Sequence, residues 1–461
     1  MFTQEKLNEL KTTFRGEIIQ PGDASYEEAR QVYNGMIQKH PKLILKCTDV
    51  ADVITAVKFG NEACRGNGML VAVRGGGHNG GGLGTVDNGI VIDLGPISYS
   101  RVDPKNKTVR VGGGTTWSEV DHATHAFGLA TPCGIIASTG VGGLTLGGGI
   151  GHLTRKYGLT IDNLLEVDMV LADGNFVTAN EKENNDLFWA VRGGGGNFGI
   201  VTSFLFRLHP VNMVYAGPTL WELDKAADVM KFYRDFITKA PEDLNGFFAF
   251  LTVPPAPPFP EELHMKKMCG IVWCYVGDEK NVDKIFEPVK NFGPPALYGI
   301  MKMPHPMLNS AFDGLYPPGY QWYWRADFVN ELSDKAIEQH IKFGKALPTM
   351  FSTMHMYPID GAASKGNRDT AWNYRHSKWS QVIVGVDPDP KNKELITKWT
   401  KDYYDALHPY SAGGAYVNFM MDEGEDRVKA SYGDNYKRLA QIKKKYDPDN
   451  FFRVNQNIKP A

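Results

Sequence analysis

The distribution of glycine constrains this chain more than any other feature. Of its 50 glycines, 28 lie between residues 71 and 200, so more than half of them fall within less than a third of the 461 residues. Glycine loses more backbone entropy on folding than any other residue, so such a cluster needs a structural reason. A collagen-like helix is excluded because the glycines follow no three-residue period. A flexible linker is excluded because they alternate with strand-like runs. The pattern therefore indicates backbone that lies close to something flat or anionic.

Four glycine loops make up this cluster. They begin at Arg74 (RGGGHNGGGLG), Val111 (VGGG), Thr139 (TGVGGLTLGGGIG) and Arg192 (RGGGGNFG). Two of them contain G-x-G-x-x-G, but both lead into a strand and not a helix, so the Rossmann interpretation fails, and no P-loop pattern occurs. Backbone N–H groups of such loops form concave anion sites. A cofactor with a pyrophosphate and large rings fits this pattern, and the alternative is four unrelated tight turns.

The overall composition excludes several classes of protein. Apolar residues are 42% and charged residues 22% of the chain, as in globular proteins. Lys plus Arg (50) does not exceed Asp plus Glu (52), so the basic excess that nucleic acid requires is missing. The five cysteines include no CxxC, which argues against a disulfide framework and against a metal site. The polar start MFTQEKLNEL and the lack of an apolar run of ~20 residues predict a cytoplasmic protein with no membrane partner. The oligomeric state stays open.

The hydrophobic pattern predicts an α+β protein in two parts. Near residue 210 glycine becomes rarer while aromatic residues and proline become frequent, which predicts a separate substrate domain with an antiparallel sheet and helices. We expect helices over 1–40 (among them 26–36), 49–67, 116–127, 333–347, 392–407 and 432–445, and strands over 42–47, 69–73, 89–94, 108–111, 166–171, 200–208, 320–329 and 379–384. The lysine run 443–445 predicts a solvated helix end.

Four separated motifs resemble one protein family, and together they cover essentially the whole chain. They are VAVRGGGHNGGG from Val71, GLATPCGIIASTGVGGLTLGGGIGHLTRKYGLTIDN from Gly128, LFWAVRGGGGNFGIVTSF from Leu187, and the tail AYVNF…YDPDNFFRVNQNIKP. The chain is thus similar to the berberine-bridge-enzyme-like flavoproteins of the PCMH-type, or vanillyl-alcohol-oxidase, FAD-binding superfamily. The resemblance implies an FAD-binding domain over 1–209, a substrate domain over 210–415, and a C-terminal segment, 416–461, that returns to the FAD-binding domain.

The resemblance also implies how FAD is held. The histidine of the glycine motif, His78, would be bonded covalently to the flavin 8α carbon. Many relatives form a second flavin bond through a cysteine whose place is taken here by Ile136; Cys133 lies three residues too early, so we expect one bond only. The expected cofactor-binding residues are Arg74, Gly75, Gly76, Gly77, His78, Asn79, Thr139, Gly140, Gly142, Gly143, Leu144, Gly148, Gly151, Asn163, Gly195, Gly199, Ile200, Val201, Tyr416 and Asn418.

The proton acceptor is harder to predict. Plant relatives use two tyrosines near the flavin, and Ile150 and Phe419 occupy their positions here. If Tyr416 lies on a strand, its odd spacing places it on the opposite face from Phe419. The candidates are Tyr416, His152, Tyr157, Gln381, Tyr323, Tyr374 and His376. We hypothesise that the base comes from residues 374–381, where Tyr374 or His376 would titrate and Gln381 would face and orient the substrate.

The predicted function is that of an FAD-dependent oxidoreductase. A hydride would pass from a CH–OH or CH–NH carbon of a small substrate to flavin N5, and dioxygen would be reduced to hydrogen peroxide. Thr139 occupies the position at which relatives control the access of oxygen to the flavin. Threonine is close in size to valine, and relatives with valine at this position behave as oxidases. Two alternatives remain, a dehydrogenase that uses another acceptor and a flavin-carrying binding protein. The aromatic residues of the second domain suit a sugar, a phenolic alcohol or an alkaloid-like amine equally well.

Overall fold

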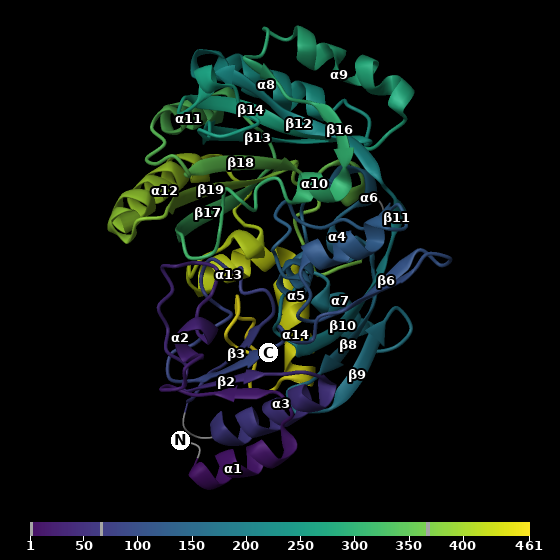
Figure 1. Cartoon of the computed structure of the whole chain (residues 1–461), viewed down its shortest axis with the longest axis vertical. Coiled ribbons are helices and arrows are strands. Elements are labelled where there is room, and N and C mark those ends of the chain that lie inside the picture. Colours follow the sequence, from purple (N-terminus) through teal and green to yellow (C-terminus); the bar gives the residue numbers. More distant parts are fainter. Residues whose placement is uncertain (1–2, 65–67, 366–368) are drawn as a thin grey trace.

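The computed structural model of the chain describes residues 3–64, 68–365 and 369–461 (Figure 1). Across these residues the chain forms a four-stranded, a five-stranded and an eight-stranded sheet, together with a two-stranded pair. Helices accompany all three large sheets, so the predicted α+β class is confirmed. Within the described ranges, no helix combines the length and the apolar character needed to cross a bilayer.

The N-terminal sheet has the strand order β1-β2-β4-β3. It is built from β1 (Glu17–Ile19), β2 (Leu43–Lys46), β4 (Ile90–Asp93) and β3 (Val71–Arg74). The last three strands are parallel, and their short apolar runs are buried, as is usual for parallel sheets. Helices α1 (Gln4–Thr13) and α3 (Val50–Cys64) pack against this sheet (Figure 1). The first glycine loop therefore leaves the carboxyl edge of the sheet directly after β3.

The predicted helix over 26–36 is wrong beyond Ala29, where α2 (Tyr26–Ala29) ends. The backbone N–H of Tyr33 donates to the Gly77 carbonyl over 3.1 Å. The side-chain amide of Asn34 donates to the carbonyls of Gly80 (2.7 Å) and Trp322 (3.0 Å). These long-range hydrogen bonds hold the segment against the first glycine loop, and they override the local helical pattern.

The five-stranded sheet is antiparallel and has the order β5-β6-β10-β8-β9. Its strands are β5 (Ser100–Asp103), β6 (Thr108–Gly112), β10 (Ile200–Arg207), β8 (Leu164–Val170) and β9 (Phe176–Asn180). The same part of the chain contains α4 (Trp117–His125), β7 (Leu129–Ala130), α5 (Val141–Gly147), α6 (Thr154–Tyr157), α7 (Asn185–Val191) and β11 (His209–Pro210).

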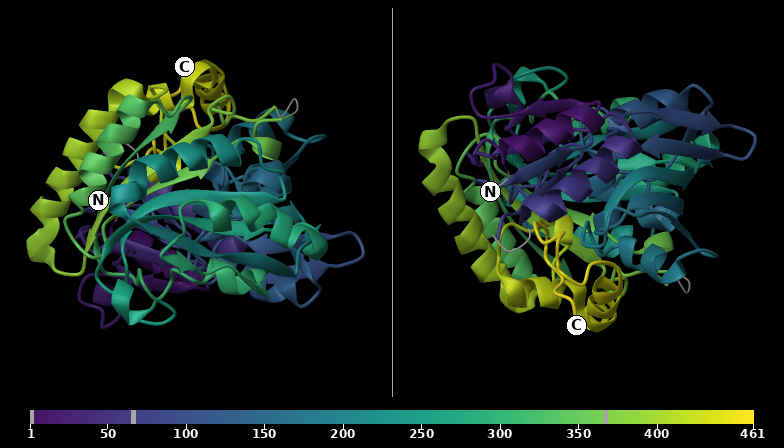
Figure 2. Two further views of the ribbon diagram at one scale, coloured as in Figure 1. Left: turned by 90° about the horizontal axis from the view of Figure 1, so that it is seen from above. Right: turned by 90° about the horizontal axis from the view of Figure 1, so that it is seen from below.

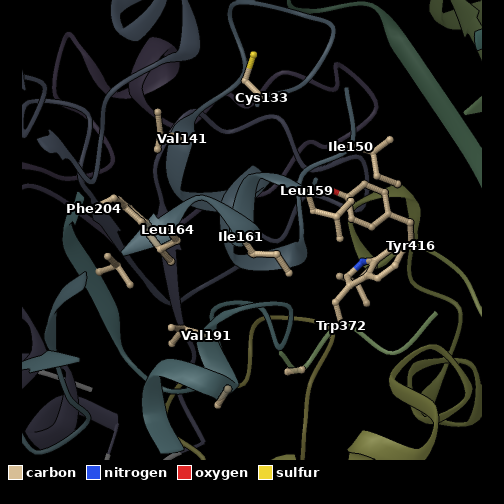
Figure 3. Close-up of a cluster of buried hydrophobic side chains, with 14 of the residues drawn as sticks. Cys133, Val141, Ile150, Leu159, Ile161, Leu164, Val191, Phe204, Trp372 and Tyr416 are labelled. Carbon is tan, nitrogen blue, oxygen red and sulfur yellow. The ribbon is translucent and has the colours of Figure 1, made fainter. Parts of the chain in front are cut away.

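Part of the third glycine loop is a helix, which corrects the loop expected over residues 139–151. Helix α5 runs through the sequence VGGLTLG with Gly140 at its N-cap. Its Val141 side chain joins the buried core beside Phe204 of β10 (Figure 3). A Cβ on Gly142 would lie 3.3 Å from the Gly113 carbonyl oxygen, so glycine lets this helix approach the neighbouring loop closely. Tertiary packing therefore outweighs the poor helix propensity of glycine.

The eight-stranded sheet is antiparallel and follows the path β15-β12-β14-β13-β18-β19-β17, with β16 beside β12. Its strands are β12 (Met213–Glu222), β13 (Leu244–Thr252), β14 (Lys267–Tyr275), β15 (Leu297–Tyr298), β16 (Met301–Pro304), β17 (Gln321–Val329), β18 (Thr353–Pro358) and β19 (Trp379–Asp387). Helices α8 (Ala226–Ile237), α9 (Val282–Asn291), α11 (Asp334–Lys345) and α12 (Lys393–Leu407) cover its outer face (Figure 1 and Figure 2). The inner face of β17, β18 and β19 looks toward the glycine loops, and α10 (His305–Asn309) lies beside α4.

The C-terminal segment lies against the N-terminal half of the chain (Figure 2). It contains the short 3-10 helix η8 (Val417–Phe419) and the helices α13 (Glu425–Tyr432) and α14 (Tyr436–Tyr446). Lys443 of α14 is fully buried and donates to Asp447 (2.6 Å) and to the Asn197 carbonyl (2.6 Å) in the fourth glycine loop. The expectation of a solvated lysine run is therefore wrong for Lys443, whereas Lys444 is exposed.

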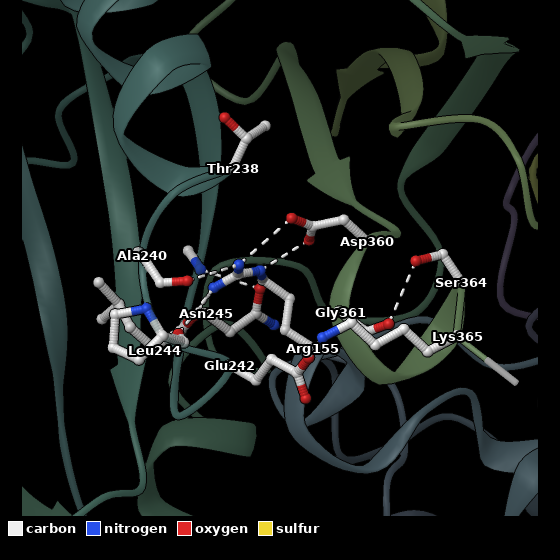
Figure 4. A network of polar contacts seen from close by, with 12 residues as sticks. Arg155, Thr238, Ala240, Glu242, Leu244, Asn245, Asp360, Gly361, Ser364 and Lys365 are labelled. Atoms are coloured by element: carbon white, nitrogen blue, oxygen red, sulfur yellow. Dashed lines mark hydrogen bonds and ion pairs between the residues drawn. The ribbon is translucent and has the colours of Figure 1, made fainter.

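Arg155 links the glycine-rich half of the chain to the eight-stranded sheet (Figure 4). Its side chain is 2% exposed and forms an ion pair of 2.6 Å with Asp360. It also donates to the backbone carbonyls of Ala240, Pro241 and Leu244, at the end of α8 and the start of β13. This guanidinium is thus fully paired without water, and it fixes the position of one half relative to the other.

Candidate active site

A single long cavity lies between the glycine loops and the inner face of the eight-stranded sheet. Its volume is about 330 Å³, which is within the usual range of small-molecule sites. Residues from both ends of the described chain line it, from Tyr33 near the start to Asn455 and Gln456 in the tail. The glycine loops form one wall, and β17, β18 and β19 form the other.

Most of the predicted cofactor residues line this cavity, although they come from four separate segments. Arg74 to Asn79 follow β3, Thr139 to Leu144 surround the start of α5, and Gly195 to Val201 lead into β10. The lining members of the predicted set are Arg74, Gly75, Gly76, Gly77, His78, Asn79, Thr139, Gly140, Gly142, Gly143, Leu144, Gly195, Gly199, Ile200, Val201, Tyr416 and Asn418. The fold thus brings together residues that are up to 344 positions apart in sequence.

Three predicted cofactor residues do not line the cavity, and each has a structural role instead. A Cβ on Gly148 would lie 2.8 Å from the Trp372 ring, and a Cβ on Gly151 would overlap the Cys133 carbonyl. These two glycines therefore permit close packing. The Asn163 amide donates to the carbonyl of Leu159 over 3.0 Å, and its oxygen lies 2.7 Å from His209 Nε2, so it stabilises the turn before β8.

The glycine wall fits a flat, ring-bearing group. The backbones of Gly76 and Gly140 touch, because a Cβ on Gly76 would lie 2.5 Å from the Gly140 nitrogen. A Cβ on Gly143 would meet nothing within 4 Å and would project into open space beside the cavity that Gly143 lines. Gly77 has a φ of +69°, a conformation that side chains other than glycine rarely adopt. The wall therefore consists of bare backbone that a large cofactor can approach directly.

His78 lies in the cavity wall where the first glycine loop passes Tyr33. The two rings stack with a centroid separation of 3.9 Å, and His78 Nε2 lies 3.2 Å from the Ser138 hydroxyl. Burial lowers the pKa of His78 to about 4, so the imidazole is neutral at physiological pH. A neutral, fixed imidazole in a cofactor cavity has the lone pair that a covalent bond to carbon requires.

Permanent charge is scarce around the cavity. Among the lining residues of the described chain, only Arg74 carries one, and it forms a buried ion pair of 2.7 Å with Asp93. The Asp93 carboxylate also accepts from the Gly95 N–H over 2.9 Å. The cation is thus held at the start of the first glycine loop, next to the backbone N–H groups that suit an anionic pyrophosphate.

The opposite wall presents a histidine and a tyrosine that the sequence analysis missed. Thr353, His355 and Tyr357 alternate along β18 toward the cavity, whereas Met354 and Met356 pack against the outer helices. His355 Nδ1 lies 2.7 Å from the Tyr357 hydroxyl. Burial lowers the pKa of His355 to about 3 and raises the pKa of Tyr357 well above its usual value, so both groups are neutral. The period-two alternation in TMHMY was the signal that these side chains share one face.

The hypothesis of a base in residues 374–381 does not match the observed positions. Gln381 lies on β19, but its neighbour Val382 faces the cavity and Gln381 points toward His340 under the helices. The Tyr374 hydroxyl donates to the Ala430 carbonyl over 2.7 Å, outside the cavity. His376 is exposed at the surface. Alternate residues of β19 face the cavity, and Gln381 is not among them. The expectation that Gln381 faces the substrate is therefore wrong.

Tyr416 lines the cavity, but not in the way the strand interpretation predicted. It is the N-cap of η8, and side chains three residues apart in a 3-10 helix lie on the same side. Its ring therefore contacts Phe419 at a centroid separation of 4.8 Å, and both residues face the cavity. The Tyr416 hydroxyl accepts from the Gly149 N–H and the Asn418 amide, each at 2.8 Å, and burial raises its pKa to about 12. The hydrogen bond from Gly149 to this tyrosine links the tail to the glycine loop.

The other candidates for a base lie outside the cavity wall. His152 is buried near Phe247, Tyr157 stacks on His209 with a centroid separation of 4.0 Å, and Tyr323 contacts Arg325 away from the cavity. Ile150 and Phe419, at the positions of the missing tyrosines, do line it.

Cys133 is buried outside the cavity lining. The Asn309 amide donates to its sulfur over 2.9 Å, while Gly134, Ile135 and Ile136 form the cavity wall. Ile136 therefore occupies a position from which a cysteine would face the cavity.

Comparisons with known proteins agree with this geometry. Residues 41–180 match a family of FAD-binding domains, and residues 415–459 match the family described as berberine and berberine like. An FAD-linked oxidoreductase of Dictyostelium discoideum is 32% identical, and the alignment covers 98% of this chain and 97% of that protein. The (R)-6-hydroxynicotine oxidase of Paenarthrobacter nicotinovorans is 28% identical, with 97% of each chain covered. The solved structure of a chitooligosaccharide oxidase superimposes with a TM-score of 0.85 at 23% identity, over 99% of this chain and all of the other, which shows a shared fold.

Proposed function

The chain belongs to the berberine-bridge-like family of FAD-linked oxidoreductases, and from this premise we propose that it is an oxidase of a small organic CH–OH or CH–NH compound. One observation supports this proposal most strongly. The cavity joins a wall of bare glycine backbone, which suits a flat cofactor, to a wall that carries the neutral His355–Tyr357 pair. The oxidases among its relatives and structural neighbours support dioxygen as the second substrate.

The roles of the two walls follow from their chemistry. When bound, FAD supplies the redox chemistry, taking a hydride from the substrate carbon and passing the electrons to dioxygen to give hydrogen peroxide. The glycine loops would hold the cofactor, with Arg74 available to its pyrophosphate and His78 available for a covalent bond to its 8α carbon. Cys133 forms no second bond, since it lies outside the cavity lining.

Acid precipitation tests the cofactor assignment. The purified protein should be yellow, and the colour should stay with the precipitate. His78→Ala should release FAD into the supernatant, whereas Cys133→Ala, the matched control, should not. A wild-type supernatant that contains all the flavin would contradict the covalent bond. Oxygen consumption with equimolar peroxide formation tests the oxidase proposal, and reduced protein that persists in air would make it a dehydrogenase.

We further propose that His355 accepts the substrate proton and that Tyr357 positions it. In the tautomer whose Nδ1–H donates to the Tyr357 hydroxyl, Nε2 keeps its lone pair. This nitrogen has no hydrogen-bond partner among the described residues, and His355 lines the cavity. As the hydride leaves the carbon, the hydroxyl proton moves to Nε2, and the product is a carbonyl compound. A positioned base contributes ~10²–10⁴-fold, and the low pKa of His355 places the expected value near the lower end of this range.

Anaerobic flavin reduction measures this role once a substrate is in hand. His355→Gln should slow reduction about 100-fold at unchanged flavin content. Tyr357→Phe should slow it less, since it loses only the fixed tautomer. Met356→Leu, on the same strand but on the opposite face, should react like wild type. Because burial lowers the pKa of His355 to about 3, the wild-type rate should stay flat from pH 8 to about pH 5. A decline with an ordinary histidine pKa near 6.5 would contradict the assignment.

A further inference from the structure

The substrate wall has one feature that the proposed function does not explain. It is almost entirely aromatic and aliphatic, with the six rings of Tyr33, Tyr316, Trp322, Trp324, Tyr357 and Phe419 around the two valines of β19 that face the cavity. Four of the rings are in contact, since Trp322 lies 5.3 Å from Tyr33, 5.3 Å from Tyr316 and 6.0 Å from Trp324 by centroid distance, and Tyr357 lies 5.8 Å from Phe419. A wall of this kind recognises the faces of a flat apolar molecule.

Several polar side chains of this wall are already used within the protein, and the indole nitrogens of Trp322 and Trp324, which have no partner among the described residues, are buried. The Tyr33 hydroxyl donates to the Tyr316 carbonyl over 2.7 Å, and the Thr353 hydroxyl donates to the Phe250 carbonyl over 2.7 Å. Tyr416 is occupied by two donors, as described above. His355 Nε2 therefore stands out as an accessible polar atom that has no partner within the described chain. A ligand meets one polar point in an otherwise apolar enclosure.

The register of the sheet fixes where this polar point lies. Strand β19 separates β17 from β18, with Val384 opposite Trp324 on one side and Val382 opposite His355 on the other. Trp324 and His355 are therefore two strand spacings apart across the sheet and two residues apart along it, roughly 12 Å in all, over a floor of valine. Trp324 is held in place because its indole lies flat on the Gly80 backbone, where any Cβ would overlap it. A flat ring system that lies on the valines reaches from the tryptophan to the histidine.

We infer that the substrate is an uncharged aromatic alcohol, whose ring lies on the Val382–Val384 floor and whose carbinol hydroxyl meets His355. This inference rests on the proposed function and selects one of the three substrate classes left open by the sequence. A sugar would bury several hydroxyls against valine and aromatic carbon, and each of them would lose its hydrogen bonds to water without gaining a partner. An ammonium would lie among lining residues that include no carboxylate within the described chain, so its charge would lose water without compensation.

Equilibrium binding tests the inference without turnover. The probe is 2-(2-naphthyl)propan-2-ol, a tertiary alcohol that has no carbinol hydrogen to give. Isothermal titration should show it binding at least 10-fold more tightly than the corresponding amine, which is charged at pH 7, and about 100-fold more tightly than cellobiose. Equal or stronger binding of the amine or of cellobiose would overturn the inference. Flavin content is measured on the same samples, so loss of FAD, which would contradict the proposed function, is distinguished from a different ligand preference.

A designed carboxylate gives a second, independent test. Phe419 lines the cavity and is half-buried, so Phe419→Glu introduces a negative charge beside the ring floor with little disturbance of the sheet. This variant should reverse the preference and bind the amine more tightly than the alcohol. Leu395→Glu adds the same charge at a side chain that is 50% exposed on α12, and it should leave the preference unchanged. A preference that is the same in all three proteins would show that the charge-free wall does not select the ligand.

Discussion

The buried ion pair between Lys443 and Asp447 allows a direct test of how the C-terminal segment holds the fourth glycine loop in place. Both side chains are 0% exposed. The ammonium donates to the Asp447 carboxylate, to the Asn197 carbonyl and, over 3.1 Å, to the Phe452 carbonyl. The carboxylate in turn accepts from the backbone N–H groups of Phe451 and Phe452, at 2.7 and 2.8 Å. Lys443→Met keeps an unbranched side chain only one atom shorter and removes the charge.

The expected cost follows from what the substitution leaves behind. The Asp447 carboxylate stays buried without its cation, and two backbone carbonyls lose their donor. Breaking one partner of a buried pair costs about 3–5 kcal/mol, which is a large share of the ~5–15 kcal/mol that stabilises a typical protein. The double variant Lys443→Met/Asp447→Asn removes both charges, so its cost should be well below the sum of the two single variants.

Hydrogen exchange of residues 436–459 measures this cost where it arises. A loss of 3–5 kcal/mol should speed the exchange of α14 amides by about 10²–10⁴-fold. Flavin incorporation during production should fall in parallel, because Asn197 lines the cavity. Lys444→Met changes the exposed neighbour and should stay within about 0.5 kcal/mol of wild type. If the two lysine variants exchange alike, or if the double variant costs the full sum, the ion pair does not hold the tail.

Three further outcomes follow from other parts of the structure. Burial raises the pKa of Asp121, which Asn309, His305 and Cys133 surround, to about 7, so the folded state keeps a proton that the unfolded state releases near pH 4. The free energy of unfolding should therefore fall by up to about 4 kcal/mol as the pH rises from 4 through 7. Urea titrations of Asp121→Asn should lack this decline. Gly76→Ala places a Cβ 2.5 Å from a backbone nitrogen and should abolish FAD incorporation by absorbance, whereas Gly314→Ala, with open space around it, should not. Deletion of residues 432–461 should likewise yield colourless protein, and normal FAD content would show that the tail is dispensable.

The glycine-lined side of the cavity could be predicted from sequence because glycine there has a local cause. Gly76 and Gly77 permit backbone contact or a positive φ, and a run of such positions is visible without any knowledge of the fold. Gly148 and Gly151 show the limit of this reasoning. In the sequence these two glycines look like those of the cavity wall, but they make room for Trp372 and the Cys133 carbonyl. Only the tertiary structure distinguishes a glycine that lines the cavity from one that permits close packing.

The substrate side could not be predicted to the same depth, because strand parity decides it. A shift of one residue moves every side chain of a strand to the other face. Gln381 was assigned the wrong face for this reason, while Val382 and Val384 face the cavity. The alternation around His355 was visible, but nothing local indicates which face of β18 meets the cofactor. The burial of Lys443 could not be predicted from the local sequence either, since it depends on the distant loop at Asn197.

The cavity is closed by Tyr33 at one end of the chain and by Asn455 and Gln456 at the other, and this arrangement dictates when the cofactor can enter. A ribosome adds about 5–20 residues per second. The last glycine loop is made about 260 residues before the end, so all four loops exist for roughly 13–50 s before the tail is available. During that interval the nascent chain has its glycine loops but lacks the C-terminal residues that complete the cavity lining. We therefore expect FAD to be enclosed only after the C-terminal segment has been made, because Asn455 and Gln456 complete the lining of the cavity.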